Sequence, residues 1–300
     1  MYSFNTLWHS PPLQLAVQLQ KQLQQQLQQH QKRQQLTAEF QWQLATCLRS
    51  PLPEVRSLLA RNRRFLQAVE KRRNKPQTLS ALRRHLQQFD CPQLTAFKNL
   101  ADQDCRSRII ATFHFGDFVY GLNTLLRHDR SERCSFVQTL ETSQPAYFDN
   151  MQRLFADQCA DASRQLPVSD NRPGALSALL KTSPCNLVMF ADLPPGFGAM
   201  GRVSFLGRQA RFPRGIACLA VRNQVPVLPV ICVFSHGRHR IILGKQLEPE
   251  FAGQTRKTAV AEIGQSLLDF FTAFLKRQPE QWRYLTVMPR YFSAAEAVSQ

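Results

Sequence analysis

The chain has 300 residues, of which 43% are hydrophobic, so it can bury a sizeable core without help from disulfides or metals. It carries 38 Lys+Arg against 21 Asp+Glu, a formal charge of +17, and the hydrophobic fraction excludes a disordered basic tail. Such an excess of positive charge favours nucleic acid, a phospholipid surface, an acidic protein or a phosphorylated substrate as partner. Composition does not choose among these four.

Residues 1–50 predict a Gln/Leu-rich amphipathic helical arm, because leucines recur every fourth residue from Leu15 to Leu27. Two interpretations stay open: a low-complexity or coiled-coil contact, and a helix that docks on a membrane surface or a partner. The start of the chain has no basic region followed by an apolar one, which predicts that it carries no signal peptide. Residues 51–104 predict a helical subdomain, with a strongly basic helix over 54–73.

The longest apolar stretch, 225–234, is about half as long as a membrane-spanning helix. Eight cysteines lie scattered, with no CxxC pair and no histidine at zinc-ligand spacing. These features predict a cytoplasmic chain with reduced thiols and no metal, attached at most peripherally to the inner face of the cell membrane.

Residues 105–293 predict an α/β catalytic domain, because buried-strand patterns alternate with helical ones. The expected fold is a mixed, mainly parallel sheet flanked by helices. The expected strands are 108–114, 134–138, 186–191, 225–234 and a hairpin return at 238–243, and the expected helices are 117–126, 147–158, 174–182, 214–222 and 255–277.

His114 and Asp117 stand together where the first of these strands passes into a helix. Ligands in such folds bind beyond the carboxyl ends of the strands, and a histidine with a nearby carboxylate can act as a general base. The alternative interpretation is that Asp117 merely caps the helix that begins at Phe118.

A GxGxxG pattern at 196–201 is interpreted as a loop, not a dinucleotide site. Two prolines precede it and the strand-like segment 202–206 follows, whereas the dinucleotide fingerprint needs a helix to open at the glycines. Basic and aromatic residues alternate over 202–214, a composition that suits nucleic acid, but no nucleic-acid-binding module accompanies them.

Four segments in this order resemble the late acyltransferases of lipid A biosynthesis, the lauroyl/myristoyl acyltransferase family with a lysophospholipid-acyltransferase-like fold. They are His114-Phe-Gly-Asp-Phe, Phe190-Ala-Asp192, Val203-Ser-Phe-Leu-Gly-Arg-Gln-Ala210 leading to Val227-Leu-Pro229, and Pro279-Glu-Gln-Trp282. The similarity covers roughly residues 105–290, and the joint order is more specific than any single segment.

The resemblance implies transfer of a fatty acyl group from an acyl-carrier-protein or coenzyme A thioester to a hydroxyl or amine of a lipid-like acceptor. The thioester is a co-substrate, and no cofactor is implied. In the family a histidine, with an acidic residue five positions later, deprotonates the acceptor. His114 matches that histidine, but Val119 stands at the acidic position, so Asp117 is the expected substitute. An acidic acyl carrier protein and a membrane-borne acceptor would both suit the basic chain.

The remaining candidate residues are assigned to substrate binding. Arg153 and Arg164 are candidates for the arginine of the family, and Arg211 or Arg214, near the start of a helix, could stabilise an oxyanion or phosphate. Asp192 is either a site-organising carboxylate or a loop anchor. The expected lining of an apolar acyl-chain tunnel is Phe113, Phe115, Phe118 and Phe205.

Two alternative functions, each from a class other than enzymes, stay open. Val119 favours a catalytically lapsed acyltransferase fold that binds an acyl carrier or a lipid. The net charge favours a basic nucleic-acid-binding protein, which salt-dependent binding of DNA or RNA would support.

Overall fold

A computed structural model describes residues 37–75, 77–103, 106–126, 134–138, 165–168, 172–182, 184–249 and 255–292. The chain divides into two compact units, Met1–Arg56 and Ser57–Gln300. In the first unit residues 37–48 are helical, and the leucine stripe at 15–27 lies outside the described residues. The predicted helix 147–158 also lies outside them.

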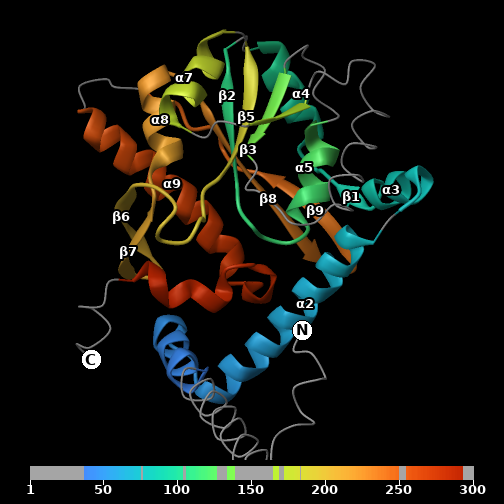
Figure 1. Cartoon of the computed structure of the whole chain (residues 1–300), viewed down its shortest axis with the longest axis vertical. Coiled ribbons are helices and arrows are strands. Elements are labelled where there is room, and N and C mark those ends of the chain that lie inside the picture. Colours follow the sequence, from blue (N-terminus) through green and yellow to red (C-terminus); the bar gives the residue numbers. More distant parts are fainter. Residues whose placement is uncertain are drawn as a thin grey trace, which may run out of the picture. The chain divides into compact units, whose positions relative to one another are not determined.

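The second unit is built on a seven-stranded sheet with the order β1-β9-β8-β2-β5-β3-β4 (Figure 1). Five neighbouring strands, β8, β2, β5, β3 and β4, run parallel, and β9 returns antiparallel to β8. The predicted mixed, mainly parallel α/β fold is therefore confirmed. The strands are β1 Phe89–Asp90, β2 Arg108–Thr112, β3 Cys134–Gln138, β4 Gln165–Val168, β5 Cys185–Phe190, β8 Val227–Ser235 and β9 Arg238–Leu243.

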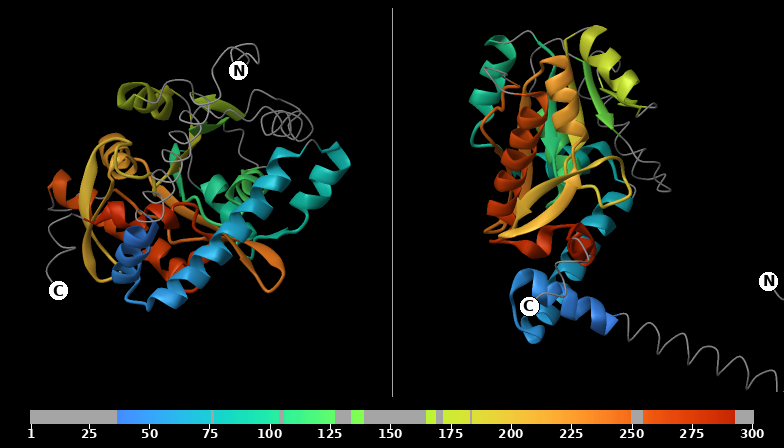
Figure 2. Two further views of the ribbon diagram at one scale, coloured as in Figure 1. Left: turned by 60° about the horizontal axis from the view of Figure 1, so that its bottom comes forward. Right: turned by 90° about the vertical axis from the view of Figure 1, so that its left-hand side faces the viewer.

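Helices cover both faces of this sheet (Figures 1 and 2). Helix α5 packs on β8 and β9 and against α3, whereas α7, α8 and α9 lie together on the opposite face. The chain passes through α5 from β2 towards β3, and it returns through α7 to β5 and through α8 to β8. Because crossovers between parallel strands are right-handed, helices that cross the sheet in opposite directions lie on opposite faces. The helices are α2 Leu52–Asn74, α3 Leu79–Leu86, α4 Leu94–Gln103, α5 Phe118–Leu126, α7 Pro173–Thr182, α8 Gly215–Asn223 and α9 Arg256–Leu275.

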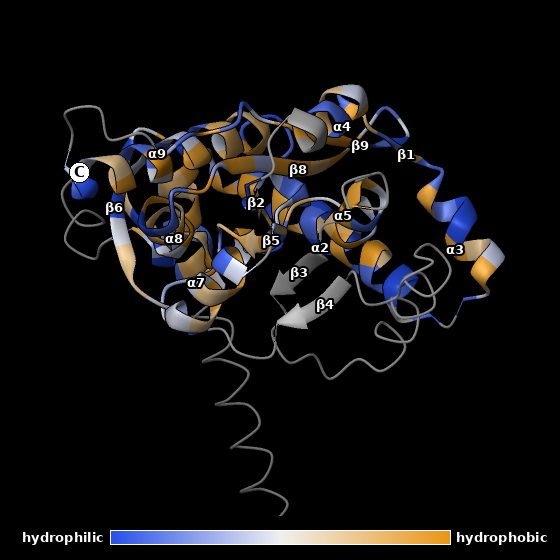
Figure 3. Ribbon diagram, turned by 90° about the horizontal axis from the view of Figure 1, so that it is seen from above, coloured by the Kyte–Doolittle hydropathy of each residue, from blue (hydrophilic) through white to orange (hydrophobic). Residues whose placement is uncertain are grey.

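The central strands are apolar because helices cover them on both sides. All five residues of β2 are buried, and Figure 3 shows β8 coloured as hydrophobic along most of its length. Helix α9 begins where Thr255 accepts a hydrogen bond from the backbone N–H of Thr258, at 3.2 Å. Among the described helices, none is both long enough and apolar enough to cross a membrane.

Strands β6 (Met200–Phe205) and β7 (Arg208–Pro213) form a separate antiparallel hairpin. Its two-residue turn, Leu206-Gly207, has positive φ at both positions (54° and 76°), as the right-handed twist of a hairpin requires. The glycine-rich segment 196–201 thus leads into a strand and opens no helix. The sequence pattern indicated a strand-like segment over 202–206 and gave no prediction for 208–213.

Candidate active site

His114 and Asp192 follow two neighbouring parallel strands. β2 ends at Thr112 and β5 at Phe190, and these two residues are register partners. The backbone N–H of Ala191 donates to the carbonyl of Thr112 at 2.8 Å, which carries the pairing one step further. Both side chains therefore come from the carboxyl edge of the sheet, where ligands bind in such folds.

The carboxylate of Asp192 holds His114 through two hydrogen bonds. Oδ1 lies 2.9 Å from Nδ1 of the imidazole, and Oδ2 accepts from the backbone N–H of His114 at 2.9 Å. Asp192 is fully buried, and His114 is 7% exposed. Since a carboxylate accepts hydrogen bonds, Nδ1 carries the proton and the lone pair is on Nε2. No hydrogen bond within the described part of the chain uses Nε2. The pair has the arrangement of a general base with its orienting acid.

Three aromatic rings surround the imidazole. Phe190 stacks on it with ring centroids 4.0 Å apart, and Phe118 and Tyr284 contact it edge-on at 5.0 and 4.8 Å. Burial, with the charge of Asp192 adding to it, raises the pKa of Tyr284 to about 12. The phenol thus stays neutral at physiological pH and adds no charge beside His114.

The segment after α9 fastens the turn that carries His114. Residues Pro279–Gln281 form a 3-10 turn, and Trp282 donates its indole N–H to Oδ2 of Asp192 at 2.9 Å. The carbonyl of Gln281 accepts from the N–H of Gly116 at 3.1 Å, and the N–H of Arg283 donates to the carbonyl of His114 at 2.9 Å. The Pro-Glu-Gln-Trp signature is therefore a structural clamp on both sides of the His114 turn.

The side chain of Gln281 extends this clamp to strand β8. Its amide oxygen accepts from the backbone N–H of Phe234 at 2.8 Å, and its amide nitrogen donates to the carbonyl of Phe234 at 2.6 Å. A glutamine thus replaces a backbone partner at a strand end. Gln281 entered the sequence prediction only as part of the Pro-Glu-Gln-Trp signature, and its contact with β8 was not predicted.

Asn62 in α2 is a further residue that the sequence analysis missed. It is 1% exposed, and its amide nitrogen donates to the carbonyls of Glu280 and Trp282, each at 2.8 Å. It ties the clamp to α2. Asn62 shares the buried face of α2 with Leu58 and Val69, and a polar amide on that apolar stripe was the available signal, because a buried amide needs specific partners.

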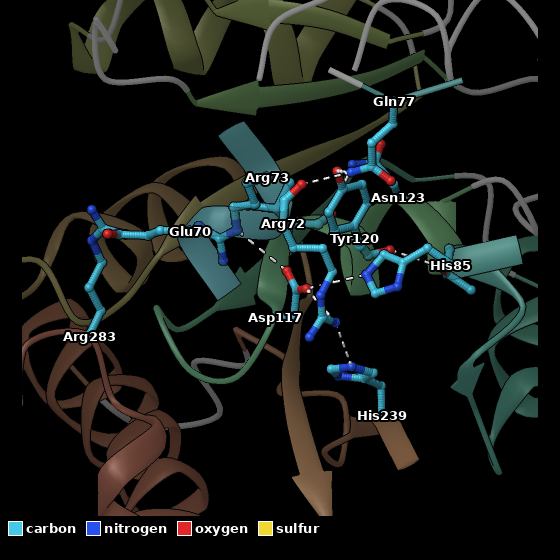
Figure 4. Close-up of polar contacts among 12 residues, drawn as sticks. Glu70, Arg72, Arg73, Gln77, His85, Asp117, Tyr120, Asn123, His239 and Arg283 are labelled. Atoms are coloured by element: carbon cyan, nitrogen blue, oxygen red, sulfur yellow. Dashed lines mark hydrogen bonds and ion pairs between the residues drawn. The ribbon is translucent and has the colours of Figure 1, made fainter. Parts of the chain in front are cut away.

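Asp117 does not supply the hydrogen bond to His114 that the sequence predicted, because Asp192 makes it. The carboxylate of Asp117 lies 3.4 Å from Nε of Arg73, 3.4 Å from Nε2 of His85 and 3.7 Å from Arg72 (Figure 4). Gly116 explains the difference, since its positive φ of 61° redirects the chain between residues 114 and 117. The backbone carbonyl of Asp117 accepts from the N–H of Gly121 at 3.1 Å as α5 begins, but the described contacts of its carboxylate are with Arg72, Arg73 and His85 and with no backbone N–H of α5.

The cations around Asp117 keep it charged although it is fully buried. Burial alone would raise the pKa of this carboxyl, but the hydrogen bond from His85 and the charges of Arg73, His85 and Arg72 outweigh burial and lower it. Arg72 also contacts Nε2 of His239 at 3.1 Å. These five residues, Asp117, Arg72, Arg73, His85 and His239, are named the Asp117 cluster below.

His239 gives the Asp117 cluster a predicted pH response. Burial, reinforced by Arg72 and His85 and opposed by Asp117, lowers its pKa from 6.5 to about 4. Between pH 6.5 and pH 4, His239 is protonated in the unfolded chain and neutral in the folded one. Because the unfolded state binds more protons, the free energy of unfolding falls as the pH falls through this range. We expect the urea midpoint to drop over this range, and His239→Gln to flatten the drop. The exposed His236→Gln is the matched control, and an equal flattening there would contradict the assignment.

Gly116 is predicted to be indispensable to the turn after His114. A Cβ at this position would lie 2.2 Å from the carbonyl oxygen of Cys232, in addition to the left-handed φ. Gly207 has a comparable φ of 76° but open space around it, so Gly207→Ala measures conformational strain alone, about 1–2 kcal/mol. Gly116→Ala should lower the free energy of urea unfolding by clearly more than Gly207→Ala. Equal losses would show that the turn can move away from Cys232.

The phenylalanines assigned to an acyl-chain tunnel do not share one location. Phe113, Phe115 and Phe205 are at most 1% exposed, and each contacts the ring of Phe271 in α9, with centroids 4.7, 6.1 and 6.3 Å apart. These three are core residues that fill space among themselves. Of the four rings, that of Phe118 packs edge-on against the imidazole of His114 in the described structure. The guanidinium of Arg73 lies 4.4 Å from the centroid of the Phe118 ring.

The described contacts of the His114 side chain include neither Arg211 nor Arg214. Arg211 is exposed on β7, and Arg214 is exposed at the N-cap of α8. Arg153 and Arg164 lie outside the described residues. Over the described ranges no group of three or more His, Cys, Asp or Glu side chains is placed to hold a metal ion.

A comparison with protein families gives one match. The family model described as bacterial lipid A biosynthesis acyltransferase matches residues 188–288. The resemblance to this family is confirmed. The matched stretch is about a third of the chain and contains Asp192 and Trp282, while His114 lies before it. It supports acyltransferase activity in general. No curated protein matched the chain.

Val119 stands at the position where the resemblance implied an acidic residue. Val119 is 6% exposed and belongs to the apolar core under β8, together with Leu122 and Cys232. Asp192, from the next strand of the sheet, supplies the carboxylate that contacts His114.

Proposed function

We propose that the chain transfers a fatty acyl group from the thioester of an acyl carrier protein or coenzyme A to a hydroxyl or amine of a lipid-like acceptor. The observation that carries the proposal is the 2.9 Å hydrogen bond between Nδ1 of His114 and Asp192, at the carboxyl edge of β2 and β5. It leaves Nε2 as a base, on a chain that matches the acyltransferase family model.

In this proposal Nε2 of His114 takes the proton from the acceptor O–H or N–H as the acceptor attacks the thioester carbonyl. The tetrahedral intermediate then breaks its C–S bond, and the leaving thiolate receives the proton from Nε2–H. The products are the acylated acceptor and the free thiol. Through its hydrogen bond to Nδ1, Asp192 fixes the tautomer and stabilises the imidazolium that forms.

Acyl transfer from a supplied acyl thioester tests the proposal. His114→Gln should lower the rate about 10²–10⁴-fold, the usual contribution of a general base. Since the imidazole is nearly buried among Phe118, Phe190 and Tyr284, circular dichroism must show that the variant is folded. Equal rates in the two proteins would remove His114 from the mechanism.

The binding module is the second candidate, favoured by the buried Val119 at the acidic position of the family. It predicts that the wild type binds an acyl thioester or acyl carrier protein but turns over none. Equilibrium binding with no product detected over many hours, for both coenzyme A and carrier-protein thioesters, would support it against the enzyme.

A further inference from the structure

The β6–β7 hairpin presents two arginines side by side on its outer face. Arg202 and Arg211 are register partners and both are exposed. Cross-strand neighbours have Cβ atoms about 4.5–5.5 Å apart, and like charges there repel. No ion pair of the described residues joins either arginine to a carboxylate; Asp269, on the neighbouring α9, instead accepts from the amide of Gln265 at 2.8 Å. Within the described ranges, no carboxylate pairs with these two arginines on the outer face of the hairpin.

The segment that forms the hairpin and its flanks is basic. Residues 193–214 contain four Arg and no Asp or Glu. Arg214 is exposed at the start of α8, and its backbone N–H donates to the carbonyl of Ala199 at 3.0 Å, which fastens it to the loop that precedes β6. Figure 2 (right) shows the hairpin in front of the seven-stranded sheet, with its outer face uncovered by other helices.

The loop before the hairpin carries an exposed aromatic side chain. Phe197 is 49% exposed, between two glycines with positive φ of 110° and 89° that have nothing within 4 Å of an added Cβ. The loop begins directly after Asp192, at the edge of the sheet where His114 lies. This loop leads directly into β6, which carries Arg202. An exposed ring together with nearby cations in the chain has the composition of a membrane-interface anchor: the ring enters the acyl boundary and the cations meet phosphates.

We propose that Phe197, Arg202, Arg211 and Arg214 form a docking surface for an anionic phospholipid bilayer. The apolar ring favours a bilayer over an acidic protein, because a bilayer offers apolar and anionic groups within the depth of one side chain. Docking there would turn the His114 edge of the sheet towards the membrane. That orientation rests on the proposed function, but binding to lipid does not.

Sedimentation of the full chain with vesicles tests this surface. The wild type should bind vesicles of phosphatidylcholine mixed with phosphatidylglycerol more tightly than phosphatidylcholine alone, and salt should weaken the binding. Arg202→Gln with Arg211→Gln should lower the partition coefficient about 30-fold, about fivefold for each arginine. Phe197→Ser should lower it on its own.

Lys181→Gln with Arg222→Gln is the matched control, since both residues are exposed and end α7 and α8 at the opposite edge of the sheet. The proposal is overturned if the wild type ignores anionic vesicles, if the control pair loses as much binding, or if the hairpin pair keeps vesicle binding and loses binding of an acidic acyl carrier protein. His114→Gln should bind vesicles like the wild type, so failure of acyl transfer and failure of docking are separable.

Discussion

Asp192→Asn should lower acyl transfer about 10³–10⁴-fold while the protein stays folded, by analogy with the carboxylate of catalytic triads. The carboxylate accepts from Nδ1 and the backbone N–H of His114 and from the indole of Trp282. An asparagine offers one oxygen and one NH₂ group, so at least one of these three donors would face another donor. If the NH₂ faces Nδ1, the imidazole must carry its proton on Nε2 and can no longer act as the base.

Steady-state rates with a saturating acyl thioester measure this effect, and Asp117→Asn is the comparison variant. Asp117 also lies beside the His114 turn, but its contacts are Arg72, Arg73 and His85. Its amide variant should lose stability and keep most of the rate per folded molecule. A larger loss of rate for Asp117→Asn than for Asp192→Asn would return the orienting role to Asp117.

Asp117→Ala should cost about 3–5 kcal/mol of unfolding free energy, the usual loss when one partner of a buried ion pair is removed. The side chain is fully buried, and its removal leaves Arg73, which is 6% exposed, and His85, also 6% exposed, without their shared carboxylate. Because Arg73 belongs to α2, His85 to α3 and Asp117 directly precedes α5, the loss should loosen the packing of α2 and α3 against α5 (Figure 4).

Urea unfolding followed by tryptophan fluorescence gives this free energy. Asp269→Ala is the matched control, since Asp269 is exposed and makes its hydrogen bond to Gln265 within one helix, and it should change stability by less than about 0.5 kcal/mol. A loss as small for Asp117 as for Asp269 would mean that the arginines find water or other partners, and that the Asp117 cluster stabilises little.

Much of the fold could be predicted from hydrophobic patterns alone. The bounds expected for β3 and β9 are those observed, and α7, α8 and α9 begin and end within two residues of expectation. Continuous apolar runs such as that of β8 need helices on both faces, which fixes the fold class. The two-residue strand β1 and the alternating, half-exposed β7 gave too weak a pattern to find.

The candidate site was predictable in its residue types but not in its pairing. His114 stands at a strand end, as expected, yet its carboxylate partner lies 78 positions further along the chain. That contact exists because β2 and β5 are neighbours in the sheet, an order that one sequence does not reveal. Asp117 was the nearest carboxylate in sequence, and the left-handed Gly116 turns it towards α2 and α3, whose packing was equally hidden.

A double-mutant cycle on acyl transfer tests most directly whether His114 and Asp192 act as one unit. Rates are measured for the wild type, His114→Gln, Asp192→Asn and the double variant, each shown to be folded. Residues that act as a unit are strongly non-additive, so the double variant should be no slower than His114→Gln within about threefold. Multiplicative losses, or full activity in either single variant, would contradict a histidine base oriented by Asp192.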